Sequence, residues 1–349
     1  MSDFKNKSNS TPLKQRLVRV DMMVGMTMLL VVVGHMSVGK VPHWYNYGLH
    51  NWIYSFHMEM FVFLSAFLIR YSYKGVNSII EYGNYIWRKI KKFVPLYFII
   101  GFGVALIACI VKGYTSDSEY WLSTLRYLFL YPRYSEASFL WYIYILLGYY
   151  LISPLFFKLP QWGRVVCCIG AMLLPSLTDS HFLCAYDFCQ YTFFYCLGVL
   201  CAEWIEEIRN TKTWIWGLMS TPFIVFSGWL FGMGAKTGFD IWQLGWWTTV
   251  TGVAALPFFY LLAMLFEKMK VTKNSLTAIS IDSYSIYLLQ MFFIYGCAMI
   301  VDKTGVTDKI PFLVFVIITT AIAIVIPIII MKMLRKIHAT ISDKKSRTQ

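Results

Sequence analysis

Residues 29–39 read LLVVVGHMSVG, an apolar run that carries an imidazole near its end. The run belongs to an apolar segment over residues 20–38, and a helix of about 20 apolar residues spans the hydrocarbon core of a bilayer. The chain of 349 residues is 58% hydrophobic and 14% charged, whereas soluble domains carry about 25% charged residues. We therefore expect an integral membrane protein and not a soluble domain.

Similar apolar segments recur along the whole chain. A backbone in lipid must form its hydrogen bonds within its own segment, so each segment is expected to be a helix. The fifth and sixth segments are short. The sequence predicts an all-α, polytopic integral membrane protein with about ten transmembrane helices. The ten segments cover residues 20–38, 52–70, 93–112, 138–156, 165–178, 190–205, 214–233, 246–266, 276–301 and 311–331.

The basic residues predict an orientation for this bundle. Most of the 31 Lys and Arg fall in alternate connections on the side of the N-terminus, which favours an N-in, C-in topology in a bacterial-type cytoplasmic (inner) membrane. The net charge of +13 is clustered between apolar segments, which indicates anionic lipid headgroups and not nucleic acid as the nearest partner. Seven basic residues fall on the other side: Lys40, Lys112, Arg126, Arg133, Lys236, Lys303 and Lys309.

Three regions follow from these patterns. Residues 1–19 are expected to form a cytoplasmic tail, 20–331 the membrane domain, and 332–349 a basic cytoplasmic tail. The eight cysteines contain no C-x-x-C pair, so we expect no metal site. Cys184 and Cys189 share a predicted loop, and whether they form a disulfide is left open.

Two histidines lie at membrane depth, where ionisable groups are costly and usually face a cavity. His35 is about three residues inside the outer end of the first predicted span, and His57 about five residues inside that of the second. Because these helices run in opposite directions, both imidazoles reach a similar depth. A neutral imidazole can take a proton from a hydroxyl, so His35 is a candidate general base; a histidine wetted by headgroups is the alternative.

Other ionisable residues accompany the histidines. Glu59 lies two residues after His57, about 200° around a regular helix, so the two are not expected to line one narrow cavity together. Arg19 and Asp21 open the first span, either as supporting site residues or as a basic flank with a local ion pair.

A basic cluster precedes the third predicted span in YIWRKIKKFVPLYFI, residues 85–99. Arg88, Lys89, Lys91 and Lys92 are compatible with a positive-inside anchor or with a site for the phosphates of a donor such as coenzyme A. The outer loops over 113–137 and 179–190 are rich in Tyr, Trp and short polar residues. They predict an interfacial aromatic belt or a surface on which a sugar-like acceptor stacks.

Several segments together resemble a known family. RVDMMVGMTMLLVVVGH (19–35), FHMEMFVFLSAFLI (56–69) and WRKIKKFVPLY (87–97) are similar to the opening of the acyltransferase-3 family of membrane O-acyltransferases. LWYIYILLGYYLISPLF (140–156), FFYCLGVLCAEW (193–204) and SIDSYSIYLLQMFF (280–293) resemble later family segments in the same order. The resemblance covers most of the chain.

The resemblance implies transfer of an acyl group from acyl-CoA, usually acetyl-CoA, to a hydroxyl of a cell-surface glycan or lipid-linked sugar. His35 matches the family's essential histidine, and His57 is expected to orient the acceptor or stabilise charge. Lys89 and Lys92 match the family's paired arginines before the third span, and these two lysines together with Arg88 are expected to hold the donor phosphates. The supporting residues expected in the site are Arg19, Asp21, Glu59, Trp141, Tyr284 and Gln290.

The chain departs from the family pattern at several positions. Val24 stands where an Arg or Lys usually precedes the first histidine by eleven residues, and Gln290 stands where a His is common. The sequence leaves direct transfer and a covalent relay open. It also leaves two rival functions, a transporter or flippase of a lipid-linked glycan and a non-catalytic homologue, and it does not address the oligomeric state.

Overall fold

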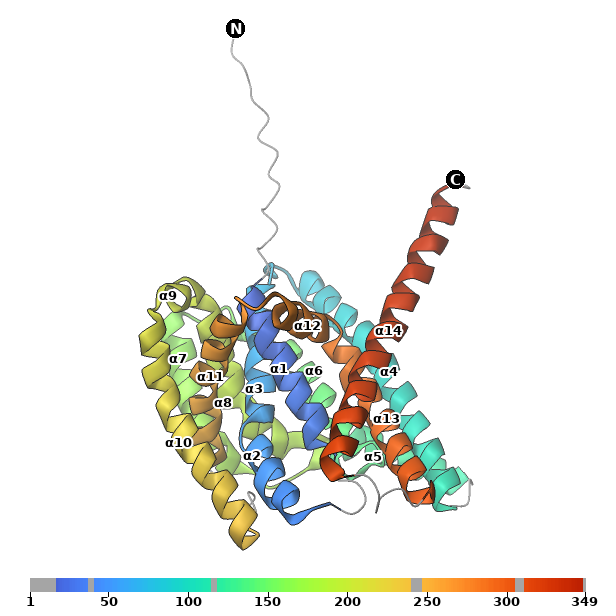
Figure 1. The fold of residues 1–349 in the computed structure, drawn as a ribbon. Helices are drawn as coiled ribbons and strands as arrows, with labels where there is room; N and C mark the ends of the chain where they lie inside the picture. The colour runs from blue at the N-terminus through green and yellow to red at the C-terminus, as the bar shows by residue number, and fades with distance from the viewer. Residues whose placement is uncertain (1–16, 37–40, 114–117, 240–246, 305–310, 348–349) are drawn as a thin grey trace.

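The computed structural model describes residues 17–36, 41–113, 118–239, 247–304 and 311–347, which form a helical bundle without strands in this part of the chain (Figure 1). The predicted all-α class is confirmed. The elements are α1 (Val18–Gly34), the π-helix η1 (Trp44–His50), α2 (Asn51–Tyr54), α3 (His57–Tyr71), α4 (Ile79–Lys112), α5 (Ser118–Leu130), the short 3₁₀ helices η2 (Pro132–Tyr134) and η3 (Ser138–Leu140), α6 (Trp141–Phe156), α7 (Gln161–Gly170), η4 (Ala171–Leu177), η5 (Phe182–Cys184), α8 (Ala185–Glu203), α9 (Ile205–Asn210), α10 (Thr213–Thr237), α11 (Trp247–Phe266), α12 (Lys270–Ile281), α13 (Ser283–Thr304) and α14 (Phe312–Arg347).

Among the described residues, seven helical runs are long and apolar enough to cross a membrane. They are Trp44–Tyr71, Ile79–Ile110, Ser138–Phe156, Thr213–Thr237, Thr248–Phe266, Ser283–Val301 and Phe312–Ile337. The other three predicted segments correspond to α1, to α7 with η4, and to α8. The structure supports a multi-pass membrane protein, while the number of ten spans and the N-in, C-in orientation stay predictions.

The start of α1 and the end of α14 lie at the same face of the bundle (Figure 1). The predicted cytoplasmic tail lies outside the described residues up to position 16, and α1 begins at Val18. At the other end, α14 continues as a helix through the predicted basic tail to Arg347. Arg335, within that extension, forms an ion pair with the buried Asp282 carboxylate.

Close backbone contacts bring the central helices together. A Cβ added at Gly198 of α8 would lie 2.3 Å from the backbone oxygen of Phe63 in α3. A Cβ at Gly25 of α1 would lie 2.2 Å from the backbone oxygen of Leu276 in α12, which crosses the start of α1 (Figure 1). Glycine is therefore required at both positions, because any side chain would separate the helices.

Helix ends in the structure differ from the predicted spans in ways that matter for the site. The predicted first span runs to residue 38, but α1 ends at Gly34 with His35 as its C-cap. Phe56 has φ −154° and ψ −15°, which interrupts the helix and makes His57 the first residue of α3. Both imidazoles therefore sit at helix ends and not several residues inside a helix.

Local sequence signals explain the other boundaries. α4 begins earlier than predicted, because the Ser78 side chain accepts a hydrogen bond from the Glu81 N–H and Glu81 accepts one from the Asn77 N–H, as in a capping box. The predicted segment 276–301 is divided at Asp282 between α12 and α13. The predicted loop 113–137 contains the helix α5.

The open question of a disulfide in the outer loop is answered in the structure. Cys184 and Cys189 are both free cysteines. Cys184 is buried at the end of η5, and burial raises the pKa of its thiol to about 12, with a further increase from the charge of Asp187.

Candidate active site

A cavity of about 870 Å³ opens at the end of the bundle where α1 ends. Its walls contain the C-terminal end of α1 and the N-terminal ends of α3, α6, α8 and α11. Glu59 and Asp187 stand in the first turns of α3 and α8. The topology thus gathers residues that are far apart in the sequence around one space.

The two predicted histidines both line this cavity. The His57 Nδ1–H donates to the backbone carbonyl of Ile53 at 3.0 Å, which leaves Nε2 as the proton acceptor of the ring. The Nδ1 of His35 is buried and has no hydrogen-bond partner among the described residues. Tyr54 lies against the His57 ring with centroids 4.5 Å apart, and His50 stacks on Tyr54 with centroids 3.9 Å apart.

Gln290 is fully buried on α13 beside His35. Neither its amide nitrogen nor its amide oxygen has a hydrogen-bond partner among the described residues. The predicted supporting residue therefore lies near the proposed base, with polar atoms available to it. Tyr284, two turns earlier on α13, lies instead against Phe93 of α4, and its buried hydroxyl has no partner in the described part of the chain.

Glu59 also lines the cavity, together with His57 and Met58. The sequence separated His57 and Glu59 for a narrow cavity, but the two line the same wide space here. The space is broad, and the three residues form the first turn of α3 at its wall, so opposite sides of that turn reach it. Glu59 is 3% exposed and packs against Gly252 of α11.

A charged cluster from the two predicted outer loops completes the cavity, and its charged members were missed by sequence analysis. The Arg133 guanidinium of η2 lies 4.0 Å from the centroid of the Trp141 ring. Its Nε donates to Asp187 Oδ1 at 2.9 Å, and its Nη2 donates to the same oxygen. Burial lowers the pKa of Arg133, but the hydrogen bond and charge of Asp187 outweigh this and raise it above the usual value. The signal available in the sequence was an opposite-charge pair in two loops of a chain with few charges.

Aromatic side chains from the same loops and helices lie around this cluster. Trp141, the predicted supporting residue, packs against Tyr191 with centroids 5.4 Å apart. Tyr186 and Tyr295 also line the cavity. Tyr186, an aromatic residue of the predicted loop 179–190, therefore lines the wall of the cavity.

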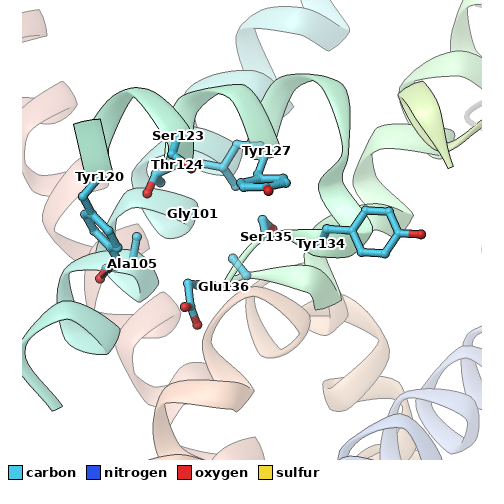
Figure 2. Close-up of a pocket in the computed structure, with 11 residues that line it drawn as sticks. Gly101, Ala105, Tyr120, Ser123, Thr124, Tyr127, Tyr134, Ser135 and Glu136 are labelled. Carbon is cyan, nitrogen blue, oxygen red and sulfur yellow. Dashed lines mark hydrogen bonds between the residues drawn. The ribbon is translucent and has the colours of Figure 1, made fainter. Parts of the chain in front are cut away.

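A smaller cavity of about 130 Å³ adjoins the outer loop (Figure 2). Figure 2 shows Ser123, Thr124 and Tyr127 of α5 above it and Ser135 and Glu136 on the opposite side. Glu136 lines both this space and the main cavity.

The predicted donor-phosphate residues lie outside the main cavity. Arg88 and Lys92 are exposed on α4, while Lys89 is half-buried with its Nζ 4.2 Å from the Tyr150 ring centroid. Lys89 borders a separate, largely apolar cavity of about 330 Å³ between α4 and α6. The Lys92 Nζ lies 6.0 Å from the ring centroid of Tyr284.

The start of α1 is tied to its neighbours by polar contacts. Arg19 Nε donates to Glu267 at 2.8 Å and Nη1 donates to the Tyr260 hydroxyl at 3.3 Å. Asp21 accepts a hydrogen bond from Ser280 at 3.4 Å. The structure therefore pairs Arg19 with α11 and its C-terminal connection, and it places neither Arg19 nor Asp21 in the wall of the main cavity.

Comparison with known proteins identifies the class. A family model described as an acyltransferase domain matches residues 17–332. The chain belongs to this family, acyltransferase-3.

A curated relative supports the assignment. The nodulation protein NolL of Sinorhizobium fredii (strain NBRC 101917 / NGR234) is 23% identical over 227 residues, which cover 64% of this chain and 57% of NolL. The chain thus spans little more than half of that relative. No solved structure shows a significant match.

Proposed function

We propose that this acyltransferase moves an acyl group, acetyl in the simplest case, from acyl-CoA to a hydroxyl of a cell-surface glycan or lipid-linked sugar at the inner membrane. One observation carries the proposal: His35 caps the C-terminal end of α1, His57 is the first residue of α3, and both side chains line the same cavity. Two imidazoles can make the proton transfers that acylation of a hydroxyl requires. In His57 the hydrogen bond from Nδ1 to Ile53 leaves Nε2 as the nitrogen that accepts a proton.

The chemistry of the cavity wall supports a sugar-like acceptor. Tyr186 and Tyr295 offer aromatic faces, and the carboxyl groups of Glu59 and Glu136 accept hydrogen bonds from hydroxyls. These residues stand on the outer side of the predicted topology. This combination suits a ring with one apolar face and several hydroxyls.

The donor is assigned to the other face of the predicted topology. Lys89, Lys92 and Arg88 on α4 would hold the phosphates of acyl-CoA, with the pantetheine arm reaching toward the histidines. The pantetheine arm would have to cover a distance comparable to the length of α1, whose 17 residues extend about 25 Å at 1.5 Å per residue. His35 would take the proton from the acceptor hydroxyl as it attacks the thioester, and His57 would orient that hydroxyl.

The experiment compares surface acylation in cells producing the wild-type protein, His35→Ala, His57→Ala and the control His43→Ala. His43 is exposed and does not line the cavity. Mass spectrometry of surface glycans and lipids should show an acyl mass increment in wild-type and control cells, and its loss in the other two.

A transporter would give a different result. It would change the amount of glycan at the surface, and the purified protein would release no thiol from acetyl-CoA. Unchanged acylation in His35→Ala cells would refute the proposed role of this residue.

A further inference from the structure

Arg133 is the one guanidinium or ammonium group among the described residues that line the main cavity. It is anchored on two sides. Its Nε and Nη2 donate to Asp187 Oδ1, and Trp141 lies beneath its guanidinium plane. Its Nη1 has no partner among the described residues, so this N–H group is free to donate into the cavity.

The anchoring residues are themselves fixed. Asp187 is 1% exposed in the first turn of α8, and Trp141 is buried at the start of α6. The Arg133 side chain, by contrast, is 33% exposed. A donor group held rigidly at the surface of a cavity is preorganised, because it needs no rearrangement when negative charge develops nearby.

The charges around Arg133 restrict what it binds. The cavity wall also contains the carboxyl groups of Glu59, Glu136 and Asp187. Three carboxyl groups against one guanidinium disfavour an anionic acceptor and the phosphates of the donor. A thioester carbonyl, which becomes negative only during the reaction, requires nothing more than a local N–H donor.

We infer that Arg133 is a catalytic residue that donates from Nη1 to the carbonyl oxygen of the acyl thioester in the main cavity, an inference that rests on the proposed function. The acceptor oxygen bonds to the carbonyl carbon while an imidazole takes the hydroxyl proton. The carbonyl electron pair moves onto the oxygen, which accepts from Arg133. The intermediate then collapses, the C–S bond breaks, and the coenzyme A thiolate takes the proton from the imidazolium. The products are the ester and free coenzyme A.

The test uses the full-length protein in proteoliposomes with acetyl-CoA, and it measures thiol release with water as the acceptor. We expect Arg133→Gln to lower kcat about 100-fold, as loss of one oxyanion donor does, with the KM for acetyl-CoA changed less than about threefold. Arg133→Lys should retain part of the rate, and added guanidinium should partly restore Arg133→Ala. Arg126→Gln is the control, since Arg126 is exposed on α5 outside both cavities.

The outcomes separate this inference from its alternatives. Thermal unfolding of each variant detects a folding defect, and guanidinium rescue of Arg133→Ala still reports the chemical role if Arg133→Gln is unstable. Unchanged kcat in Arg133→Gln would show that Arg133 only supports the loop, and a rise in the KM for acetyl-CoA alone would show that it binds the donor; either result overturns the inference. A wild-type protein inert toward acetyl-CoA and longer acyl-CoA thioesters would refute the proposed function itself, and this assignment with it.

Discussion

Replacing Gly198 by alanine should separate the two helices that position the cavity. The added Cβ would lie 2.3 Å from the Phe63 backbone oxygen and 3.0 Å from the Ala66 Cβ, whereas ordinary contact begins at 3.4 Å. Because the first obstacle is backbone, α8 must move from α3 by about 1 Å. Overpacking of this kind costs about 1–3 kcal/mol, and the gain in helix propensity from Gly to Ala returns less than about 1 kcal/mol.

The same shift should reduce activity, because α3 begins with His57 and α8 carries Asp187. A displacement of about 1 Å between reacting groups costs up to about 100-fold in rate. The assay is thermal unfolding in detergent combined with thiol release from acetyl-CoA. Gly217→Ala on α10 is the control, because no atom lies within 4 Å of its added Cβ and its stability should stay equal or rise. Wild-type stability and rate in Gly198→Ala would refute the close contact between α3 and α8.

Three further predictions concern single side chains. Gln290→Met should leave the unfolding temperature of the protein equal or higher, because it removes buried amide atoms that lack partners among the described residues. The rate of thiol release from acetyl-CoA should fall at least about tenfold. A loss of stability with full activity would contradict this prediction. Glu136→Gln should raise the KM for a sugar acceptor severalfold with kcat little changed, measured by transfer kinetics, and a kcat effect alone would contradict an acceptor contact. At pH 8, maleimide should label Cys184 roughly 100-fold more slowly than the cysteine of an unstructured peptide, since the raised pKa leaves little thiolate until the pH approaches about 12. Labelling of Cys184 at the rate of the peptide, followed by mass spectrometry, would contradict its burial.

The helical content of the chain was predictable, because a long apolar segment in lipid must form its backbone hydrogen bonds within itself and therefore folds as a helix. The predicted segment 138–156 coincides with η3 and α6, and the segment 246–266 differs from α11 by one residue. Boundaries set by local polar signals were less predictable. The Ser78 cap starts α4 well before its apolar part, and Phe56 breaks the helix before His57.

The site was predicted in part. Ionisable residues at membrane depth identified His35 and His57, because burying such groups requires a reason. Arg133 and Asp187 were missed, since each alone is an ordinary loop charge and only their pairing across 54 positions reveals a site. Their contact depends on the packing of η2 against the start of α8, which no local pattern encodes. The shared cavity of Glu59 and His57 was not foreseen, because helical periodicity does not describe a cavity wider than one helix face.

The structure also explains why Val24 is compatible with this fold. Val24 is 7% exposed, next to Gly25, where the backbone of α12 approaches α1 closely. A cation at position 24 would have to be desolvated, and a buried cation is tolerated only with a counter-charge. The nearby Arg19 is already paired with Glu267 and hydrogen-bonded to Tyr260.

In the proposed scheme the donor phosphates therefore depend on α4, and substitution of Lys89 and Lys92 by glutamine should raise the KM for acetyl-CoA more than it lowers kcat. A selective loss of kcat would instead place these lysines near the reacting thioester, which their separation from the cavity of His35 argues against.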